Sequence, residues 1–354
     1  MTASTVNTND SAMLNSEHAG VLDPQVRNLL QSMANQPPIS YYSLGPDGAR
    51  QSYRESRQRL QGPPVGVAEV RDMQAATAAG PLGMRLYKPF SLTGGQLHGA
   101  LPCLVYFHGG GFTLGDLDSH DGLCRGLSHQ GQCALVAVDY RLAPEHRFPA
   151  AVEDAIAAVQ WVRSQAQALG LDGSRVAVGG DSAGGALAAV VAMALRGEAP
   201  ALALQLLLYP ITDMAHDLPS HHRLAEGYGL TRESLLWFRA NYLPDPTLVS
   251  DWRASPLRGE LAGLPPACVI TAGFDPLLDE GRRYAERLLE AGVPLTYECF
   301  GGMIHGFALM TAQVAAARHA IYRAGQSLRT AFGITVPHLP ASSRPPRQTR
   351  RTGS

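Results

Sequence analysis

Ser182 is the residue of this sequence whose surroundings best suit a nucleophile. It lies within Gly180–Gly185 (GDSAGG), which fits the pattern G-x-S-x-G, between a predicted strand at 175–179 and a predicted helix at 183–197. A sharp turn from strand to helix strains such a serine and exposes its hydroxyl, and glycines there avoid collisions of Cβ atoms with either element. The alternative is a plain glycine-rich turn, and the flanking strand and helix favour the nucleophile.

A serine hydroxyl needs a general base, and the base needs an acid that orients it. Among twelve histidines, His305 is the best placed, because it lies in a glycine-flanked loop at 301–307, just after the last predicted strand. Asp275 follows the preceding predicted strand and is the candidate acid, with Asp213 as the competing position. The candidates therefore follow one another as nucleophile (Ser182), acid and base.

A second glycine motif, His108–Phe112 (HGGGF), comes directly after the predicted strand 102–107. Attack on an acyl carbon creates a negatively charged oxygen, and each N–H donor aimed at that oxygen lowers the barrier by roughly 3 to 4 kcal/mol. The bare backbone of Gly110 and Gly111 suits this role, and the N–H of Ala183 is the expected third donor. A phosphate-binding loop is the alternative, but the G-x-G-x-x-G spacing and a P-loop lysine are missing.

The substrate pocket is expected to be lined by residues that border these motifs, namely Phe112, Asp181, Ile304 and Phe307. One further cluster looks like a metal site at first sight; it consists of Asp213, His216, Asp217, His221 and His222. Its spacing matches no closed zinc pattern, so we expect a solvated loop there. The sequence predicts no metal site and no cofactor.

Apolar runs that alternate with helical stretches must position these residues. The predicted strands are 66–72, 83–88, 102–107, 133–139, 175–179, 203–209, 267–272 and 295–300. The predicted helices lie near 119–130, 150–168, 183–197, 277–291 and 311–330. Continuously apolar middle strands are typical of a parallel sheet covered on both faces, so we expect a doubly wound α/β sheet. The first two strands follow one another without a helix and could form an antiparallel edge.

The chain divides into a large catalytic domain, a cap and two tails. We expect a flexible N-terminal tail at 1–21, a cap segment at 22–64, an α/β domain at 65–210 and 266–336, a cap insertion at 211–265 and a disordered C-terminal tail at 337–354. Asp23 and Pro24 suit the start of a short amphipathic helix in the first cap segment. Within the insertion, a helical stretch at 231–242 is the clearest element.

The composition excludes several classes of partner. Lys and Arg number 29 against 30 Asp and Glu, so the net charge of -1 offers no field to attract nucleic acid or an anionic membrane. The start of the chain lacks the regions of a secretory signal, and no apolar run is long enough to cross a membrane, so we expect a cytoplasmic protein. The five cysteines are expected to be buried thiols. A homodimer through the strand at 295–300 is a further possibility.

Five motifs in order carry a family resemblance: HGGGF, DYRLAPEHRFPAA (139–151), GDSAGG, DPLLDEG and HGF. Together they resemble the hormone-sensitive-lipase-like esterases, also called bacterial esterase family IV, over residues 65 to 332. The resemblance implies an α/β-hydrolase fold: a mostly parallel eight-stranded sheet with helices on both faces and a helical cap. It also implies Ser182, Asp275 and His305 as the catalytic triad, and Gly110, Gly111 and Ala183 as oxyanion donors.

The resemblance further implies hydrolysis of short- to medium-chain acyl esters through an acyl-enzyme, with a small-molecule ester as the partner. Asp139, Arg141 and Glu145 match a family segment that we expect to brace the HGGG loop through buried ion pairs. Three alternatives stay open: an amidase on the same triad, a long-chain lipase, and a receptor that has lost catalysis. The plant receptors of this family lack the catalytic histidine, whereas His305 is present here.

Overall fold

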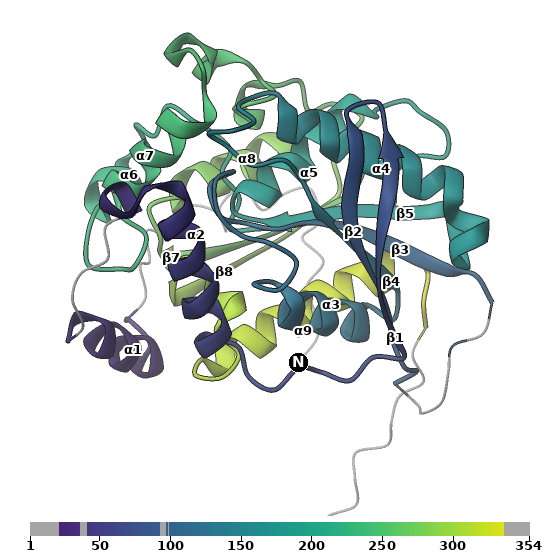
Figure 1. The fold of residues 1–354 in the computed structure, drawn as a ribbon, viewed down its shortest axis with the longest axis horizontal. Helices are drawn as coiled ribbons and strands as arrows, with labels where there is room; N and C mark the ends of the chain where they lie inside the picture. Colours follow the sequence, from purple (N-terminus) through teal and green to yellow (C-terminus); the bar gives the residue numbers. More distant parts are fainter. Residues whose placement is uncertain (1–20, 36–40, 93–96, 98, 336–354) are drawn as a thin grey trace, which may run out of the picture.

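An eight-stranded sheet forms the centre of the computed structural model, which describes residues 21–35, 41–92, 97 and 99–335 (Figure 1). The strands are β1 (Glu69–Thr77), β2 (Gly80–Lys88), β3 (Leu101–Phe107), β4 (Ala134–Asp139), β5 (Leu171–Asp181), β6 (Gln205–Leu208), β7 (Ala267–Phe274) and β8 (Leu295–Ile304). Their order across the sheet is β1-β2-β4-β3-β5-β6-β7-β8. β2 runs antiparallel to both neighbours, and the other pairs are parallel. The predicted fold class is therefore confirmed, including the antiparallel edge.

Two layers of helices bury the apolar strands. Along β3, Val105 and Phe107 pack into one hydrophobic core, while Leu104 and Tyr106 pack into the other, as the alternation of side chains in a strand requires. One face is covered by α4 (Ala150–Leu169), α5 (Ala183–Ala194) and α8 (Leu278–Glu290); the opposite face is covered by α3 (Asp121–Gly131) and α9 (Ala315–Ala331) (Figure 1). Each of these helices was expected from the sequence, with bounds that differ by a few residues.

The chain begins its described part with two helices that do not belong to the sheet layers. The predicted first helix is present as α1 (Pro24–Ala34), and the side chain of Asp23 caps it by accepting a hydrogen bond from Gln25 N at 2.7 Å. The second, α2 (Tyr41–Leu60), was not predicted. It contains non-helical backbone angles at Gly45, directly before Pro46, and this break with its polar composition hides the helical pattern in the sequence.

Ion pairs attach α2 to the central domain. Arg50 donates to Glu145 at 2.6 Å and to the carbonyl oxygens of Thr113 and Ala143. Bracing of the loop after β3 therefore comes from α2, a contribution that the sequence did not reveal.

Asp139, Arg141 and Glu145 were expected to brace the HGGG loop through buried ion pairs, and the structure differs from this expectation. Arg141 pairs with buried Asp154 at 2.8 Å, but Asp139 is exposed and Glu145 is about half exposed, so the prediction of buried pairing within this segment is wrong. Arg141 reaches inward to α4 and Glu145 reaches Arg50 on α2, so the two side chains have partners on different elements.

The predicted insertion contains α6 (Pro219–Arg223), α7 (Arg232–Tyr242) and two short 3-10 helices, η1 (Pro246–Ser250) and η2 (Pro256–Arg258). The expected helix at 231–242 corresponds to α7. α7 contacts α2 across the carboxyl ends of the strands, so two segments distant in sequence meet there. The domain limits given above stay a prediction, and the expected tails lie outside the described residues except for Val21.

The cysteines follow their prediction with one exception. All five are free thiols, and four of them are buried. Cys299 is exposed, because it lies on β8, which forms an edge of the sheet and is covered less completely than the strands inside it.

Candidate active site

Ser182 lies at a sharp turn between β5 and α5. Its backbone angles are φ 55° and ψ -118°, a left-handed conformation that costs a non-glycine residue about 1–3 kcal/mol and holds the side chain above the sheet. The glycines around it permit close packing: a Cβ atom on Gly184 would collide with the carbonyl oxygen of Phe107 at the end of β3, and one on Gly180 would collide with Gly184. The structure therefore has the strained turn that the motif predicts.

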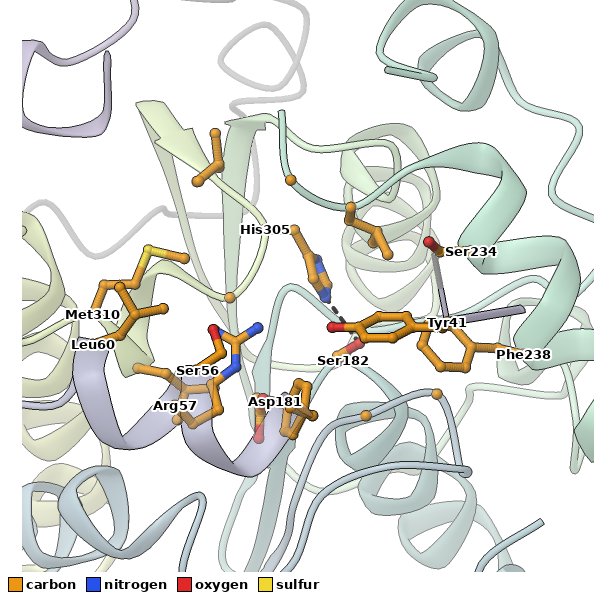
Figure 2. A pocket seen from close by; sticks show the side chains of 18 of the residues that line it. Tyr41, Ser56, Arg57, Leu60, Asp181, Ser182, Ser234, Phe238, His305 and Met310 are labelled. Carbon is orange, nitrogen blue, oxygen red and sulfur yellow. Dashed lines mark hydrogen bonds between the residues drawn. The ribbon is translucent and has the colours of Figure 1, made fainter. Parts of the chain in front are cut away.

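The three candidate residues of the triad form a continuous chain of hydrogen bonds. Ser182 Oγ lies 3.0 Å from His305 Nε2 (Figure 2). His305 Nδ1 lies 2.7 Å from Asp275 Oδ2. In this arrangement the ring donates Nδ1–H to the carboxylate, and Nε2 is free to accept the serine proton. His305 follows β8 directly, so the end of that strand sets the position of the imidazole.

Asp275 rather than Asp213 meets the histidine. Asp275 is fully buried after β7, and its Oδ1 accepts the N–H of Leu277 at 2.9 Å, which fixes the carboxylate. Asp213 follows β6 but turns away, and it forms an ion pair with Arg258 at 3.3 Å. The geometry therefore favours Asp275 as the residue that orients the imidazole.

The HGGG loop approaches the serine from β3. Gly110 and Gly111 have φ values of 122° and 61°, and within the described part of the chain their N–H groups donate to no other protein group. Both glycines line the cavity beside Ser182, and Ala183 occupies the first position of α5, where its N–H has no partner within the helix. These three N–H groups are therefore available to a ligand.

A buried carboxylate holds this loop in place. Asp181 accepts hydrogen bonds from Gly109 N at 2.9 Å and from Tyr106 Oη at 2.8 Å, and it faces His120 Nε2 at 3.4 Å. Burial alone raises the pKa of this carboxyl, but His120 and the hydrogen bond of Tyr106 outweigh burial and lower it. The sequence analysis missed Tyr106 and His120, since neither belongs to a motif of the site.

A cavity of about 130 Å³ opens above the hydrogen-bonded chain (Figure 2). Its walls come from the HGGG loop, the end of β8, α2 and the insertion; the side chains include Tyr41, Tyr53, Arg57, Leu230, Ser234, Phe238, Leu309 and Met310. Two of the four expected pocket residues, Asp181 and Ile304, line it. The α2 and α7 residues were missed because their convergence is purely tertiary.

The other two expected pocket residues lie behind its wall. Phe112 stacks on Tyr242 with ring centroids 3.8 Å apart, because its own positive φ of 59° turns the side chain into the core. Phe307 is fully buried and packs against Tyr209 and Phe300. Both support the site from outside the cavity, so the expectation that they line it is wrong.

Comparisons with known proteins agree with this geometry. A family model described by the alpha/beta hydrolase fold matches residues 104–309. The carboxylic ester hydrolase LipN of Mycobacterium tuberculosis is 44% identical over 267 residues, 73% of this chain and 69% of LipN. The ethyl acetate hydrolase of Pseudomonas putida is 40% identical over 276 residues, 77% of this chain and 86% of that protein. The chain belongs to the hormone-sensitive-lipase-like family of α/β hydrolases.

Solved structures extend the likeness to nearly the whole of this α/β hydrolase. LAE6, an alpha/beta hydrolase enzyme from the metagenome of Lake Arreo, is 42% identical with a TM-score of 0.84, and the match covers 89% of this chain and 99% of LAE6. An esterase from Pyrobaculum calidifontis is 35% identical with a TM-score of 0.80, covering 89% and 100%. Among the described residues of the hydrolase, no helix is long and apolar enough to cross a membrane.

The segment with Asp213, His216, Asp217, His221 and His222 is not the solvated loop that the sequence predicts. His216 and His221 are buried instead of solvated, and together with Glu280 on α8 they bring three possible metal-ligand atoms within 4.8 Å of one another. The prediction of a solvated loop is wrong here because Glu280, distant in sequence, draws the segment inward. It holds only for the exposed pair formed by Asp217 and His222.

The hydrogen bond at His221 Nδ1 argues against this residue as a metal ligand. His221 Nδ1 accepts the N–H of Leu218 at 2.9 Å, so Nε2 carries the ring hydrogen and faces Glu280 Oε2 at 3.5 Å. A histidine that ligates through Nε2 instead carries its hydrogen on Nδ1 and donates it to an acceptor. The carboxylate of Glu280 also accepts the N–H groups of Thr212 and Asp213.

This buried pair predicts a decline of stability with rising pH. Burial raises the pKa of Glu280 to about 7; burial lowers the pKa of His221, but its interaction with the Glu280 carboxylate outweighs this and raises it. Both groups bind protons more tightly in the folded state, so the stability they contribute is lost as pH rises through about 7. We expect Glu280→Gln to reduce the fall in the free energy of unfolding between pH 5 and 8, measured by urea titration.

The matched control for that measurement is Glu226→Gln, which removes an exposed carboxyl of the insertion that contains His221. It should keep the pH dependence of the original protein. Equal slopes for the original protein and Glu280→Gln would show that the buried pair does not govern the pH dependence.

Proposed function

We propose that this protein is a serine carboxylesterase that hydrolyses short- to medium-chain acyl esters through an acyl-enzyme intermediate. The observation that carries the proposal is the hydrogen-bonded chain from Ser182 through His305 to Asp275, with distances of 3.0 and 2.7 Å. The esterase activities named for the relatives support the same reaction class. The cavity volume of about 130 Å³ favours small substrates, since sites for drug-sized ligands usually measure roughly 300–1,000 Å³.

The geometry supports a two-step acyl transfer. His305 Nε2 takes the proton of Ser182 as Oγ attacks the ester carbonyl carbon, and buried Asp275 stabilises the imidazolium that forms. The carbonyl oxygen becomes negative and accepts hydrogen bonds from the N–H groups of Gly110, Gly111 and Ala183. The imidazolium then donates its proton to the departing alcohol oxygen, which leaves the acyl group on the serine.

Water completes the cycle by the same route. His305 removes a proton from a water molecule, the resulting nucleophile attacks the acyl carbon, and Ser182 recovers its proton as the carboxylic acid leaves. The small exposed fraction of Ser182, 6%, keeps the attacked carbonyl in a largely water-excluded site where the N–H donors act strongly.

Replacing Ser182 tests the proposed nucleophile. Ser182→Ala should lower the turnover of p-nitrophenyl acetate by roughly six orders of magnitude, because the variant lacks the hydroxyl that forms the acyl-enzyme. Circular dichroism and thermal unfolding should match those of the original protein. Substantial hydrolysis by a folded Ser182→Ala variant would refute the proposed mechanism.

Replacing Asp275 and Asp213 in turn tests which of the two carboxylates orients the imidazole. Asp275→Asn should reduce kcat by roughly 10⁴-fold, because the amide no longer holds the tautomer in which Nε2 is free to accept a proton. Asp213→Asn is the matched control, and we expect it to keep kcat within a few-fold, since Asp213 pairs with Arg258. The reverse pattern, with Asp275→Asn active and Asp213→Asn inactive, would mean that the acid is assigned to the wrong residue.

A panel of p-nitrophenyl esters tests the proposed acyl-chain length and leaving group. Across p-nitrophenyl esters from acetate to palmitate, kcat/KM should be highest for short and medium acyl chains and fall steeply for long ones. A p-nitroanilide of the best acyl group should react far more slowly, because an amine leaves less readily than an alcohol. A maximum at long chains would indicate a lipase, and comparable anilide turnover would indicate an amidase.

A further inference from the structure

Arg57 places a positive charge in the wall of the cavity. It lies on α2 and lines the cavity with Ser182 and His305, and in Figure 2 its guanidinium points from the α2 side toward this pair. Its Nε and Nη1 atoms are buried and have no hydrogen-bond partner among the residues that the structure describes. A Cβ atom built on Gly306 would lie 3.5 Å from Nη1, so the guanidinium lies against the residue that follows His305.

Arg50 and Arg54 of the same helix form ion pairs, whereas Arg57 forms none with the residues that the structure describes. Arg50 and Arg54 form ion pairs with Glu145 and Asp116, each at 2.6 Å. In the part of the chain that the structure describes, no carboxylate comes within ion-pair distance of Arg57, whose guanidinium carbon lies 4.6 Å from the centre of the Tyr53 ring. A guanidinium stays protonated in proteins, and removing an unpaired charge from water costs several kcal/mol.

The carboxylate that shares the cavity attracts Arg57 electrostatically but forms no ion pair with it in the described part of the chain. Asp181 also lines the cavity, but its Oδ1 is engaged by Tyr106, Gly109 and His120. A second buried polar atom, the hydroxyl of Tyr209, lies outside the cavity lining; it also lacks a hydrogen-bond partner among the described residues and interacts electrostatically with Arg57. The cavity wall thus contains, in Arg57, N–H donors for which the described part of the chain supplies no acceptor.

We propose that Arg57 binds a carboxylate carried by the ester substrate, on the acyl part or on the alcohol part. This inference rests on the proposed esterase function and narrows its substrates to small esters that bear a negative charge. A planar guanidinium matches a carboxylate through two parallel N–H···O bonds, and such charge-assisted bonds gain strength where water is excluded. Hydrolysis of a half-ester then adds one water and yields a dicarboxylic acid and an alcohol.

The test compares substrates that differ only in charge. Monomethyl succinate and methyl levulinate have nearly the same shape, but a carboxylate in the first replaces an acetyl group in the second. Monomethyl esters from malonate to adipate vary the distance between the two groups, and acetoxyacetate places the charge on the alcohol part instead. We expect at least one charged ester to exceed its neutral counterpart in kcat/KM by about 10-fold or more, as a charge-assisted hydrogen bond allows.

Variants then assign the preference to Arg57. Arg57→Gln should lower the ratio of charged to neutral kcat/KM by about 10-fold or more, and Arg57→Lys should restore part of it. Arg59→Gln is the matched control, since it removes an exposed arginine of the same helix and should leave the ratio and the basal activity unchanged. A purely structural role of Arg57 beside Tyr53 would change both substrates alike and leave the ratio intact.

The outcomes separate this inference from the proposed function. If the original protein hydrolyses methyl levulinate and p-nitrophenyl acetate but prefers none of the charged esters, the inference is overturned and the esterase function stands. A preference that persists in Arg57→Gln, with its thermal unfolding unchanged, overturns the inference as well. If neutral and charged esters are both inert, the proposed function itself fails. The comparison of substrates in the original protein needs no variant to fold.

Discussion

The parallel alignment of β3, β5, β7 and β8 is the constraint on which the site depends. Because these strands run in the same direction, their carboxyl ends share one edge of the sheet, where the HGGG loop, Ser182, Asp275 and His305 emerge in turn. β5 lies between β3 and β6, so the loop with the free N–H groups meets the serine from one side and the imidazole from the other. Hydrogen bonds of 2.7 and 3.0 Å demand positions fixed to a fraction of an ångström, which buried strands provide.

Asp181 connects the turn at Ser182 to the HGGG loop. It precedes Ser182 in the chain and accepts the N–H of Gly109, so the strained turn and the HGGG loop share one buried anchor. A carboxylate beside a developing negative oxygen opposes catalysis unless its charge is compensated. Tyr106, Gly109 and His120 supply that compensation, which is reflected in the lowered pKa of Asp181. The same donors that stabilise the fold therefore keep the site suitable for an oxyanion.

Sequence reasoning reached the reactive residues because each one ends an apolar strand and lies in a local glycine motif. The chemistry of Ser182 and His305 can thus be read within a few residues of each. The cavity could not be read in this way, because Arg57 and Phe238 meet only when α2 packs against α7, and the break at Gly45 hides the first of these helices. The buried state of His221 likewise depends on Glu280, a partner that spacing along the chain does not reveal.

The residues that react and the residues that would select the substrate stand on different parts of the fold. Ser182 and Asp275 follow strands that are buried on both faces, and His305 follows the edge strand β8. The residues that would touch the variable parts of a substrate stand on α2 and α7, and α2 is attached through surface ion pairs such as that of Arg50 with Glu145. Exposed ion pairs contribute only about 0–1 kcal/mol, so these elements can change with little cost to the sheet. A single arginine in such a wall can therefore change which esters bind without moving Ser182, His305 or Asp275.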